Sequence, residues 1–129
     1  MAIRILVVDD SMIFRDGLRL LIESRVNWEV CGEAVDGLEG VQKNRLLKPH
    51  LIIMDLSMSR MSGIEAAVEI LKEFPKVPIL LLTPYLTRQL AEEARNVGIR
   101  ATLSKTAPHQ LVDGIDATLH GEEFTIPMT

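Results

Sequence analysis

The stretch LIIM at residues 51–54, followed by Asp55, decides the fold. All four residues are apolar, so a strand formed here would be buried on both of its faces. The stretch PILLL at residues 78–82 has the same character. Strands that are apolar on both faces lie inside parallel sheets, which helices cover from both sides. The two stretches therefore predict an α/β protein built around a parallel sheet.

The rest of the chain alternates short apolar runs with amphipathic stretches of helical periodicity. We expect strands at residues 3–8, 30–34, 51–54, 78–82 and 100–104, and helices at 11–25, 38–47, 63–74, 87–97 and 108–120. In the third helix, we predict that Ile64, Ala67, Val68 and Leu71 face the core. Right-handed crossovers then give a doubly wound (βα)5 sandwich with a parallel five-stranded sheet, and only residues 122–129 lack periodicity.

Composition narrows the classes of protein. The chain has 129 residues, of which 47% are apolar and 25% charged, and its net charge is -4. These values are typical of one soluble domain and exclude a disordered chain. An acidic chain has no general attraction to nucleic acid or to anionic membranes, and the apolar runs are too short to cross a bilayer. The single cysteine, Cys31, cannot form an internal disulfide, so we expect a reducing, cytoplasmic location.

Polar residues follow four of the expected strands. Asp9 and Asp10 come after the first strand, Asp55 after the third, Thr83 after the fourth and Lys105 after the fifth. Because ligands of such folds bind outside the carboxyl ends of the strands, these residues are candidates for one shared site. Any one of them alone is more simply a helix cap or a solvated side chain. The signal lies in their falling at the same end of one sheet.

Three neighbouring carboxylates repel one another unless a cation or a shifted pKa compensates. With oxygen ligands only, the pattern favours Mg²⁺ before Ca²⁺. Lys105 would supply a positive charge to phosphate oxygens, and Thr83 would supply a hydroxyl donor. A carboxylate can itself accept a phosphoryl group, and Asp55, alone at the end of a central strand, is the best candidate.

Five motifs now resemble a known family. They are ILVVDDS at residues 5–11, PHLIIMDL at 49–56, MSG at 61–63, PILLLT at 78–83 and LSK at 103–105. Together they resemble the CheY-like receiver domains of bacterial two-component response regulators, over residues 3 to about 121. The resemblance implies a flavodoxin-like sheet with strand order 2-1-3-4-5. It also implies a receiver domain at residues 1–121, with 122–129 as a tail or the start of a linker.

The same resemblance implies a role for each site residue. Asp55 would be the phosphoacceptor, Asp10 a direct Mg²⁺ ligand with Asp9 acting largely through water, the Ser57 carbonyl a further ligand, Thr83 the switch hydroxyl and Lys105 the phosphate-pairing lysine. A sensor histidine kinase would donate the phosphoryl group. The domain would be no enzyme beyond its own phosphorylation and dephosphorylation.

Two further segments are similar to receivers of the NarL/LuxR type, namely EVCGEAVDG at residues 29–37 and LHGEE at 119–123. Such receivers usually lead through a linker into a DNA-binding helix-turn-helix, so the resemblance implies transcription control through a domain absent from this chain. We expect no direct nucleic-acid binding here. A homodimer would use the fourth helix, fifth strand and fifth helix, where we expect Arg88, Glu92, Arg95 and His109 to be exposed.

Three positions depart from the family pattern. Ser59 stands where a proline is usual, which predicts a more mobile loop after the third strand. Pro84 follows the switch threonine and has no N–H to donate to a phosphoryl group. Thr102 replaces the usual switch aromatic, a role that Tyr85 would fill only in part if it is more than an ordinary loop residue.

These departures keep a second interpretation open, a pseudo-receiver that acts as a phosphorylation-independent interaction module. A third, a haloacid-dehalogenase-like phosphatase, needs a second acid two residues after the nucleophile, where Ser57 stands, and a cap domain. Glycine-rich phosphate-binding loops do not occur in the sequence.

Overall fold

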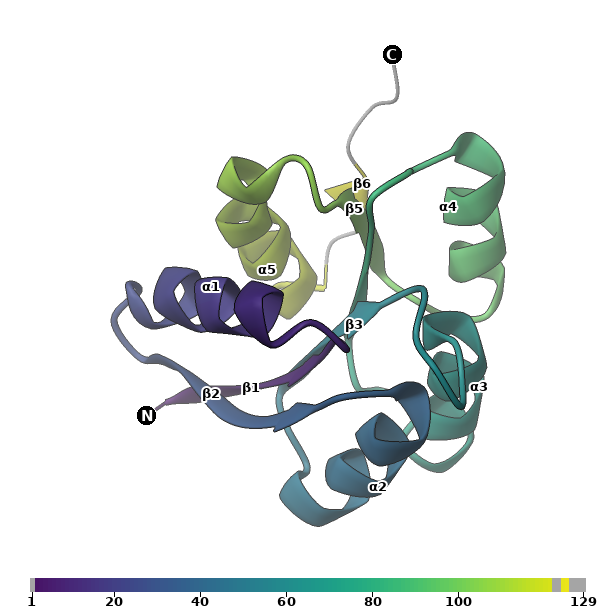
Figure 1. Cartoon of the computed structure of the whole chain (residues 1–129), viewed down its shortest axis with the longest axis horizontal. Helices are drawn as coiled ribbons and strands as arrows, with labels where there is room; N and C mark the ends of the chain where they lie inside the picture. The colour runs from purple at the N-terminus through teal and green to yellow at the C-terminus, as the bar shows by residue number, and fades with distance from the viewer. Residues whose placement is uncertain (1, 122–123, 126–129) are drawn as a thin grey trace.

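The computed structural model describes residues 2–121 and 124–125 (Figure 1). One parallel sheet has the order β2-β1-β3-β4-β5-β6. Its strands are β1 (Ile3–Val8), β2 (Trp28–Ala34), β3 (Leu51–Asp55), β4 (Ile79–Thr83), β5 (Ala101–Ser104) and β6 (Phe124–Thr125). The helices are α1 (Met12–Glu23), α2 (Gly37–Leu47), α3 (Gly63–Glu73), α4 (Arg88–Asn96) and α5 (Leu111–Leu119), the last preceded by a 3-10 turn at Pro108–Gln110. The predicted order 2-1-3-4-5 is confirmed.

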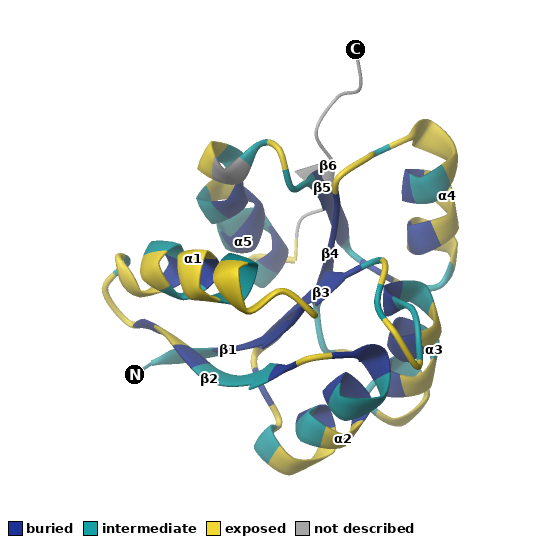
Figure 2. Ribbon diagram, viewed as in Figure 1, coloured by how far each residue is buried: buried dark blue, intermediate teal, exposed yellow. Residues whose placement is uncertain are grey.

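Two apolar cores lie on opposite faces of the sheet, as Figure 2 shows by the dark strands between the helical layers. Ile53 and Leu80 pack with α1 and α5, whereas the alternate residues Ile52 and Leu81 pack with α2, α3 and α4. Every residue of β3 and β4 is buried. The central strands therefore behave as the sequence predicted, because side chains alternate between two faces that are both covered.

Most helices begin where a short polar side chain accepts a backbone N–H, which satisfies a donor that the first turn leaves open. Ser11 caps α1, Asp36 caps α2 and Thr87 caps α4. Ser62 forms a reciprocal capping box with Glu65 at the start of α3. These caps fix helix starts close behind the strand ends, where the polar candidate residues lie.

The structure differs from the sequence predictions in three elements. In α3, Ala67 is buried as predicted, and Ile64 and Leu71 are half-buried but pack against the core. Val68 is half-buried, and the buried side also includes Ala66 and Ile70, which the sequence did not single out. The helix is apolar over two adjoining faces, so the periodicity alone did not set its rotation, and the small alanines face the sheet.

The last helix is divided, because Gln110 caps α5 without a side-chain hydrogen bond and the preceding turn winds as a 3-10 helix. The short strand β6 pairs with Ala101 and Thr102 of β5. Two residues carry no periodic signal, so the sequence did not predict this strand. Among the described residues, no helix has the length and apolar character needed to cross a membrane.

Candidate functional site

Three carboxylates gather at the carboxyl ends of β1 and β3. Asp9, Asp10 and Asp55 each offer a carboxylate oxygen, and these oxygens all lie within 4.8 Å of one another. The register pairs Val8 with Met54, which brings the residues that follow them to the same sheet edge. Asp9 is 1% exposed and Asp55 4% exposed, whereas Asp10 is exposed. The arrangement is one exposed carboxylate over two buried ones.

Lys105 brings a positive charge into this cluster. Its Nζ lies 2.7 Å from Oδ2 of Asp9 and 3.2 Å from Oδ1 of Asp55. The Lys105 N–H donates to the carbonyl of Thr83 at 2.8 Å, which extends the β4–β5 pairing by one residue. Nζ also lies 4.2 Å from the centre of the Phe14 ring, within range of a cation–π interaction. The ammonium is therefore held between two carboxylates and an aromatic ring.

Burial and charge shift the pKa values of this cluster. Burial, and then the nearby charge of Asp9, raise the pKa of Asp55 to about 6, although Lys105 acts in the opposite direction. Burial alone would lower the pKa of Lys105, but its contacts with Asp9 and Asp55 outweigh burial and raise that pKa. The lysine therefore stays charged beside Asp55 at neutral pH.

Thr83 and Ser57 are two further predicted site residues, and each lies at or just after the carboxyl end of a central strand. Thr83 is the last residue of β4 and is buried, and its Oγ1 accepts the N–H of Tyr85 at 3.3 Å. Ser57 lies in the exposed loop after Asp55, and its assignment as a ligand stays a prediction. Tyr85 is 83% exposed and Thr102 is 3% exposed, so the aromatic ring of this region lies at the surface.

Sequence reasoning missed the residues that hold Asp9 in place. Nη1 of Arg15 donates to the backbone carbonyl of Asp9 at 2.6 Å, and the Ser11 N–H donates to its Oδ1 at 2.8 Å. Arg15 is itself bound by Glu33, with Nε 2.8 Å from Oε1, and Arg19 reaches the other oxygen of Glu33 at 2.6 Å. No pattern in a single sequence marks these contacts, because they join α1 to the end of β1 and to β2.

The donor set fits a hard divalent cation. All the candidate ligands are oxygens, and three carboxylates face a single ammonium group. Oδ2 of Asp9 is buried and has an ion-pair contact with Lys105, but it receives no well-directed hydrogen bond. Asp9, Asp10 and Asp55 could therefore hold Mg²⁺ through side-chain oxygens.

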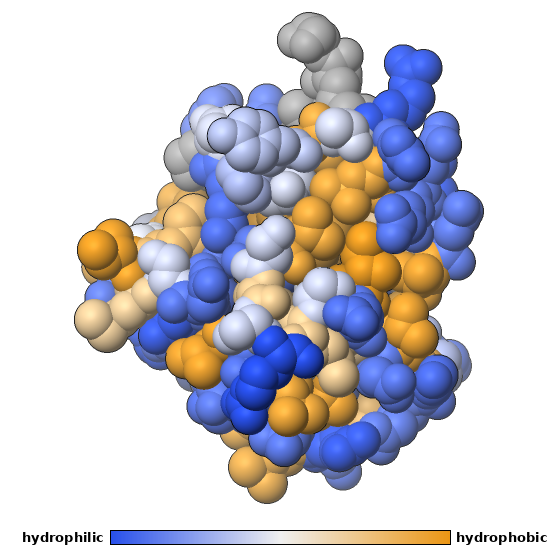
Figure 3. All heavy atoms as spheres, turned by 45° about the vertical axis from the view of Figure 1, so that its right-hand side comes forward, coloured by the Kyte–Doolittle hydropathy of each residue, from blue (hydrophilic) through white to orange (hydrophobic). Residues whose placement is uncertain are grey.

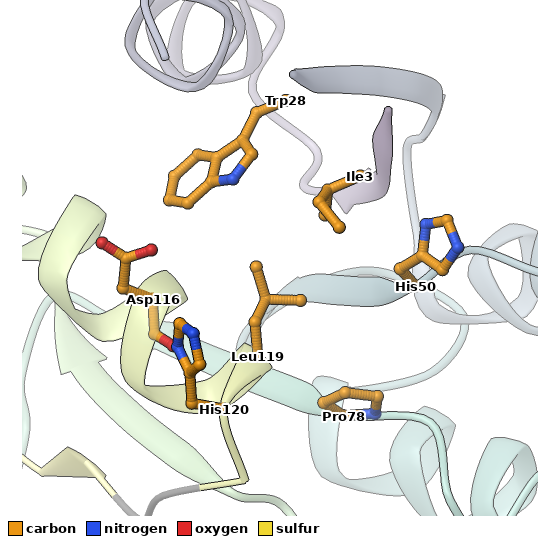
Figure 4. Close-up of a pocket in the computed structure, with 7 residues that line it drawn as sticks. All are labelled: Ile3, Trp28, His50, Pro78, Asp116, Leu119 and His120. Atoms are coloured by element: carbon orange, nitrogen blue, oxygen red, sulfur yellow. The ribbon is translucent and has the colours of Figure 1, made fainter. Parts of the chain in front are cut away.

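A cavity of about 440 Å³ lies at the opposite, amino-terminal end of the sheet (Figure 4). Its polar lining is already engaged within the chain. Nδ1 of His50 accepts the N–H of Arg4, the His120 ring bonds to the carbonyl of Asp116, and the Asp116 carboxylate pairs with Arg25. The acidic cluster is the stronger candidate site, because its charges are not neutralised.

Comparison with known proteins shows the family to which the chain belongs. Residues 5–116 match the family model described as the response regulator receiver domain. The chain is 37% identical over 121 residues to the uncharacterized transcriptional regulatory protein YxjL of Bacillus subtilis, covering 93% of this chain and 56% of that protein. It is 34% identical over 128 residues to the response regulator protein VraR of Staphylococcus aureus, covering 98% of this chain and 61% of that protein.

The fold is also similar to solved structures. A two-component response regulator of the LuxR family from Aurantimonas sp. SI85-9A1 has a TM-score of 0.94 and 34% identity, covering 98% of this chain and 91% of that chain. The chain spans between half and two thirds of the length of the two curated relatives. On these matches, which agree with the strand order, the chain belongs to the family of response regulator receiver domains, of the LuxR type.

Proposed function

We propose that Asp55 accepts a phosphoryl group from a sensor histidine kinase in a Mg²⁺-dependent step, and that the modified domain changes conformation to control an output. The observation that carries this proposal is the Lys105 ammonium, 3.2 Å from Asp55 inside a cluster of three acids. Family membership supports the same role. The output is transcription, through a DNA-binding domain elsewhere in a longer protein, and the site of action is the cytoplasm.

The chemistry follows from the side chains. An oxygen of Asp55 attacks phosphorus, a P–O bond forms, and the P–N bond to the kinase histidine breaks, with its electron pair going to the imidazole nitrogen. Lys105 would leave its contact with Asp55 to pair with a phosphoryl oxygen, while the Thr83 hydroxyl would donate a hydrogen bond to another. Mg²⁺, held by the three carboxylates and the Ser57 carbonyl, would supply charge neutralisation. We propose no chemistry beyond phosphorylation and dephosphorylation of the domain itself.

The output surface would be the face formed by α4, β5 and α5. Arg88, Glu92, Arg95 and His109 are all exposed there, as expected. Figure 3 shows hydrophilic residues at the outer margin of the molecule on the α4 side, with hydrophobic ones inward of that margin. β6 pairs along the edge of β5, so a second copy docking on this face would meet β6 or displace it. We propose residues 1–121 as the phosphoacceptor domain and 122–129 as a tail or the start of a linker.

A specific observation favours the alternative, a pseudo-receiver. Pro84 directly follows Thr83 and offers no N–H to a phosphoryl group, and Thr102 cannot act as an aromatic switch. In that case the fold would serve as a phosphorylation-independent interaction module. The intact set of Asp9, Asp10, Asp55, Thr83 and Lys105 argues for the phosphorylated switch.

Acetyl phosphate distinguishes the two functions. We expect intact-mass spectrometry of the wild-type protein, incubated with acetyl phosphate and Mg²⁺, to show one phosphoryl adduct that Asp55→Asn and a metal chelator both abolish. Asp116→Asn, which changes an acid at the opposite end of the sheet, is the matched control and should keep the adduct. A wild-type protein with no adduct and no binding of beryllofluoride would establish the pseudo-receiver.

A further inference from the structure

The loop between β3 and α3, residues 56–62, is closed at its base by backbone hydrogen bonds. The Leu56 N–H donates to the carbonyl of Leu82 at 3.0 Å, and the Gly63 N–H donates to the carbonyl of Leu56 at 2.8 Å. Beyond this base, Ser57, Ser59 and Arg60 are exposed. Ser59 leaves the backbone dihedral angle φ at its position unrestricted, as a proline would not. The middle of the loop therefore needs another restraint if it is to keep one conformation.

Arg60 has an unusual backbone conformation in the middle of this loop. Its φ is 67°, in the left-handed region that a residue with a Cβ rarely adopts. The Met61 N–H donates to the carbonyl of Ser59 at 2.8 Å across the same turn. Glycine or asparagine would suit this backbone better than arginine. Arg60 therefore holds an unfavourable backbone conformation, and a favourable contact of its side chain has to offset that cost.

The side chain of Arg60 forms an ion pair with Asp36, the N-cap residue of α2. Nε of Arg60 donates to Oδ2 of Asp36 at 2.7 Å, and the Asp36 side chain is only 4% exposed. The other oxygen of Asp36 accepts the Glu39 N–H at 2.8 Å as the cap of α2. This backbone bond, and then Arg60, hold the pKa of Asp36 below its usual range against the effect of burial, so the carboxylate is charged.

The backbones of the two elements also meet at this point. A Cβ built on Gly37, the residue after Asp36, would lie 2.3 Å from the carbonyl oxygen of Met61, the residue after Arg60. The ion pair joins Asp36 to Arg60, and the close approach joins the next residue of each segment, Gly37 and Met61. The start of α2 thus packs directly against the loop that begins one residue after Asp55.

We propose that Asp36 and Arg60 are positioning residues for the phosphorylation site. Their ion pair holds the loop at residues 56–62 against α2, and so fixes the Ser57 carbonyl where the metal would bind. This inference rests on the proposed function, because it assigns the ion pair a purpose only if Mg²⁺ binds there.

The test compares four single variants of the whole chain and the double variant that combines Arg60→Asn with Asp36→Asn. Arg60→Asn removes the positive charge but tolerates the left-handed backbone, and Arg60→Lys restores the charge. Asp36→Asn keeps a capping oxygen for α2 but loses the negative charge. The matched control is Arg45→Gln, because Arg45 near the other end of α2 pairs with Glu73 at the end of α3, far from the loop.

The readouts are Mg²⁺ affinity by calorimetry, amide hydrogen exchange of residues 56–62 without metal, and the midpoint of unfolding in urea. We expect Arg60→Asn to weaken Mg²⁺ binding about three- to tenfold and to speed exchange in the loop, with little change in the urea midpoint. Arg60→Lys should recover most of the affinity. Asp36→Asn should match Arg60→Asn, the double variant should add little more, and Arg45→Gln should behave as wild type.

Wild-type Mg²⁺ affinity and unchanged loop exchange in Arg60→Asn would overturn the inference, even if the wild-type protein is phosphorylated normally. If the wild-type protein itself binds no Mg²⁺ and forms no phosphoryl adduct, the proposed function fails instead. Loop exchange without metal then decides whether the ion pair holds the loop, since that readout needs neither metal nor phosphate.

Discussion

The ammonium of Lys105 lies 3.2 Å from Oδ1 of Asp55. In this position the lysine partly neutralises a carboxylate that is 4% exposed, and it occupies space beside the oxygen that would accept a phosphoryl group. The same ammonium contacts Asp9 at 2.7 Å. The internal cation therefore keeps these acids compatible with folding, and under the proposed function it would change partners when a phosphoryl group binds.

Replacing Lys105 should expose the repulsion that it relieves. We expect Lys105→Met, which keeps an apolar chain over Phe14, to lower the free energy of unfolding by about 1–3 kcal/mol at pH 7 without metal. Urea denaturation measures the change. Lys72→Met is the control, because Lys72 pairs with Glu69 on the exposed side of α3 and should matter by less than about 0.5 kcal/mol. Equal stability of the two variants would contradict a buried, repulsive cluster.

Removing the charge of Asp55 should have the opposite effect on stability. Because the pKa of Asp55 rises from 3.8 to about 6 on folding, the folded protein favours the protonated acid. The stability associated with the protonated Asp55 side chain is therefore fully present below pH 4, and it is lost as the pH rises through about 6 and the buried carboxyl ionises. We expect Asp55→Asn to stabilise the metal-free protein by about 1–2 kcal/mol at pH 7.5 and to flatten stability between pH 4 and 6. Urea midpoints across this pH range test both, and a variant with unchanged pH dependence would argue against the raised pKa.

The sequence predicted the positions of Asp9, Asp55 and Lys105 because strand ends in a parallel sheet meet at one edge. It could not predict the contacts between side chains from different elements. Arg15 reaches the Asp9 carbonyl and Arg60 reaches Asp36 only because helices and loops pack in particular rotations, which periodicity does not set. The two-residue strand β6 shows the same limit, since its pairing depends on where the chain returns after α5.

Glu33 should stabilise the start of α1 in a pH-dependent way. Hydrogen bonds from Arg19 and then Arg15 hold the pKa of Glu33 below its usual 4.5, although burial acts in the opposite direction. A lowered carboxyl pKa gives stability that is present above pH 4.5 and is lost as the pH falls through the folded value. Glu33→Gln should therefore lower the free energy of unfolding by about 0.5–1 kcal/mol at pH 7 and by little at pH 3. A loss of the same size at both pH values would mean that packing, not charge, is responsible.

Pro84 should limit the response to phosphate. An N–H at this position would add one donor beside Thr83, so we expect Pro84→Ala to bind beryllofluoride with Mg²⁺ about three- to tenfold more tightly. Calorimetric titration measures the difference. Pro75→Ala, at another exposed proline just after α3, controls for loss of backbone restraint and should leave the Kd unchanged. If Pro84→Ala binds no tighter than wild type, the missing donor has no part in recognition.

Two helical glycines should respond in opposite directions to the same added methyl group. A Cβ on Gly63, at the start of α3, would lie 2.2 Å from the backbone carbonyl oxygen of Asp55, whereas a Cβ on Gly17, within α1, meets nothing within 4 Å. Gly63→Ala should therefore destabilise by about 1–3 kcal/mol and move the Asp55 backbone, which lowers phosphorylation by acetyl phosphate. Gly17→Ala should stabilise by about 0.5–1 kcal/mol through helix propensity and leave phosphorylation unchanged. Urea denaturation and adduct formation, measured on both variants, check the contrast. A Gly63→Ala protein as stable and as reactive as wild type would show that α3 need not approach Asp55 this closely.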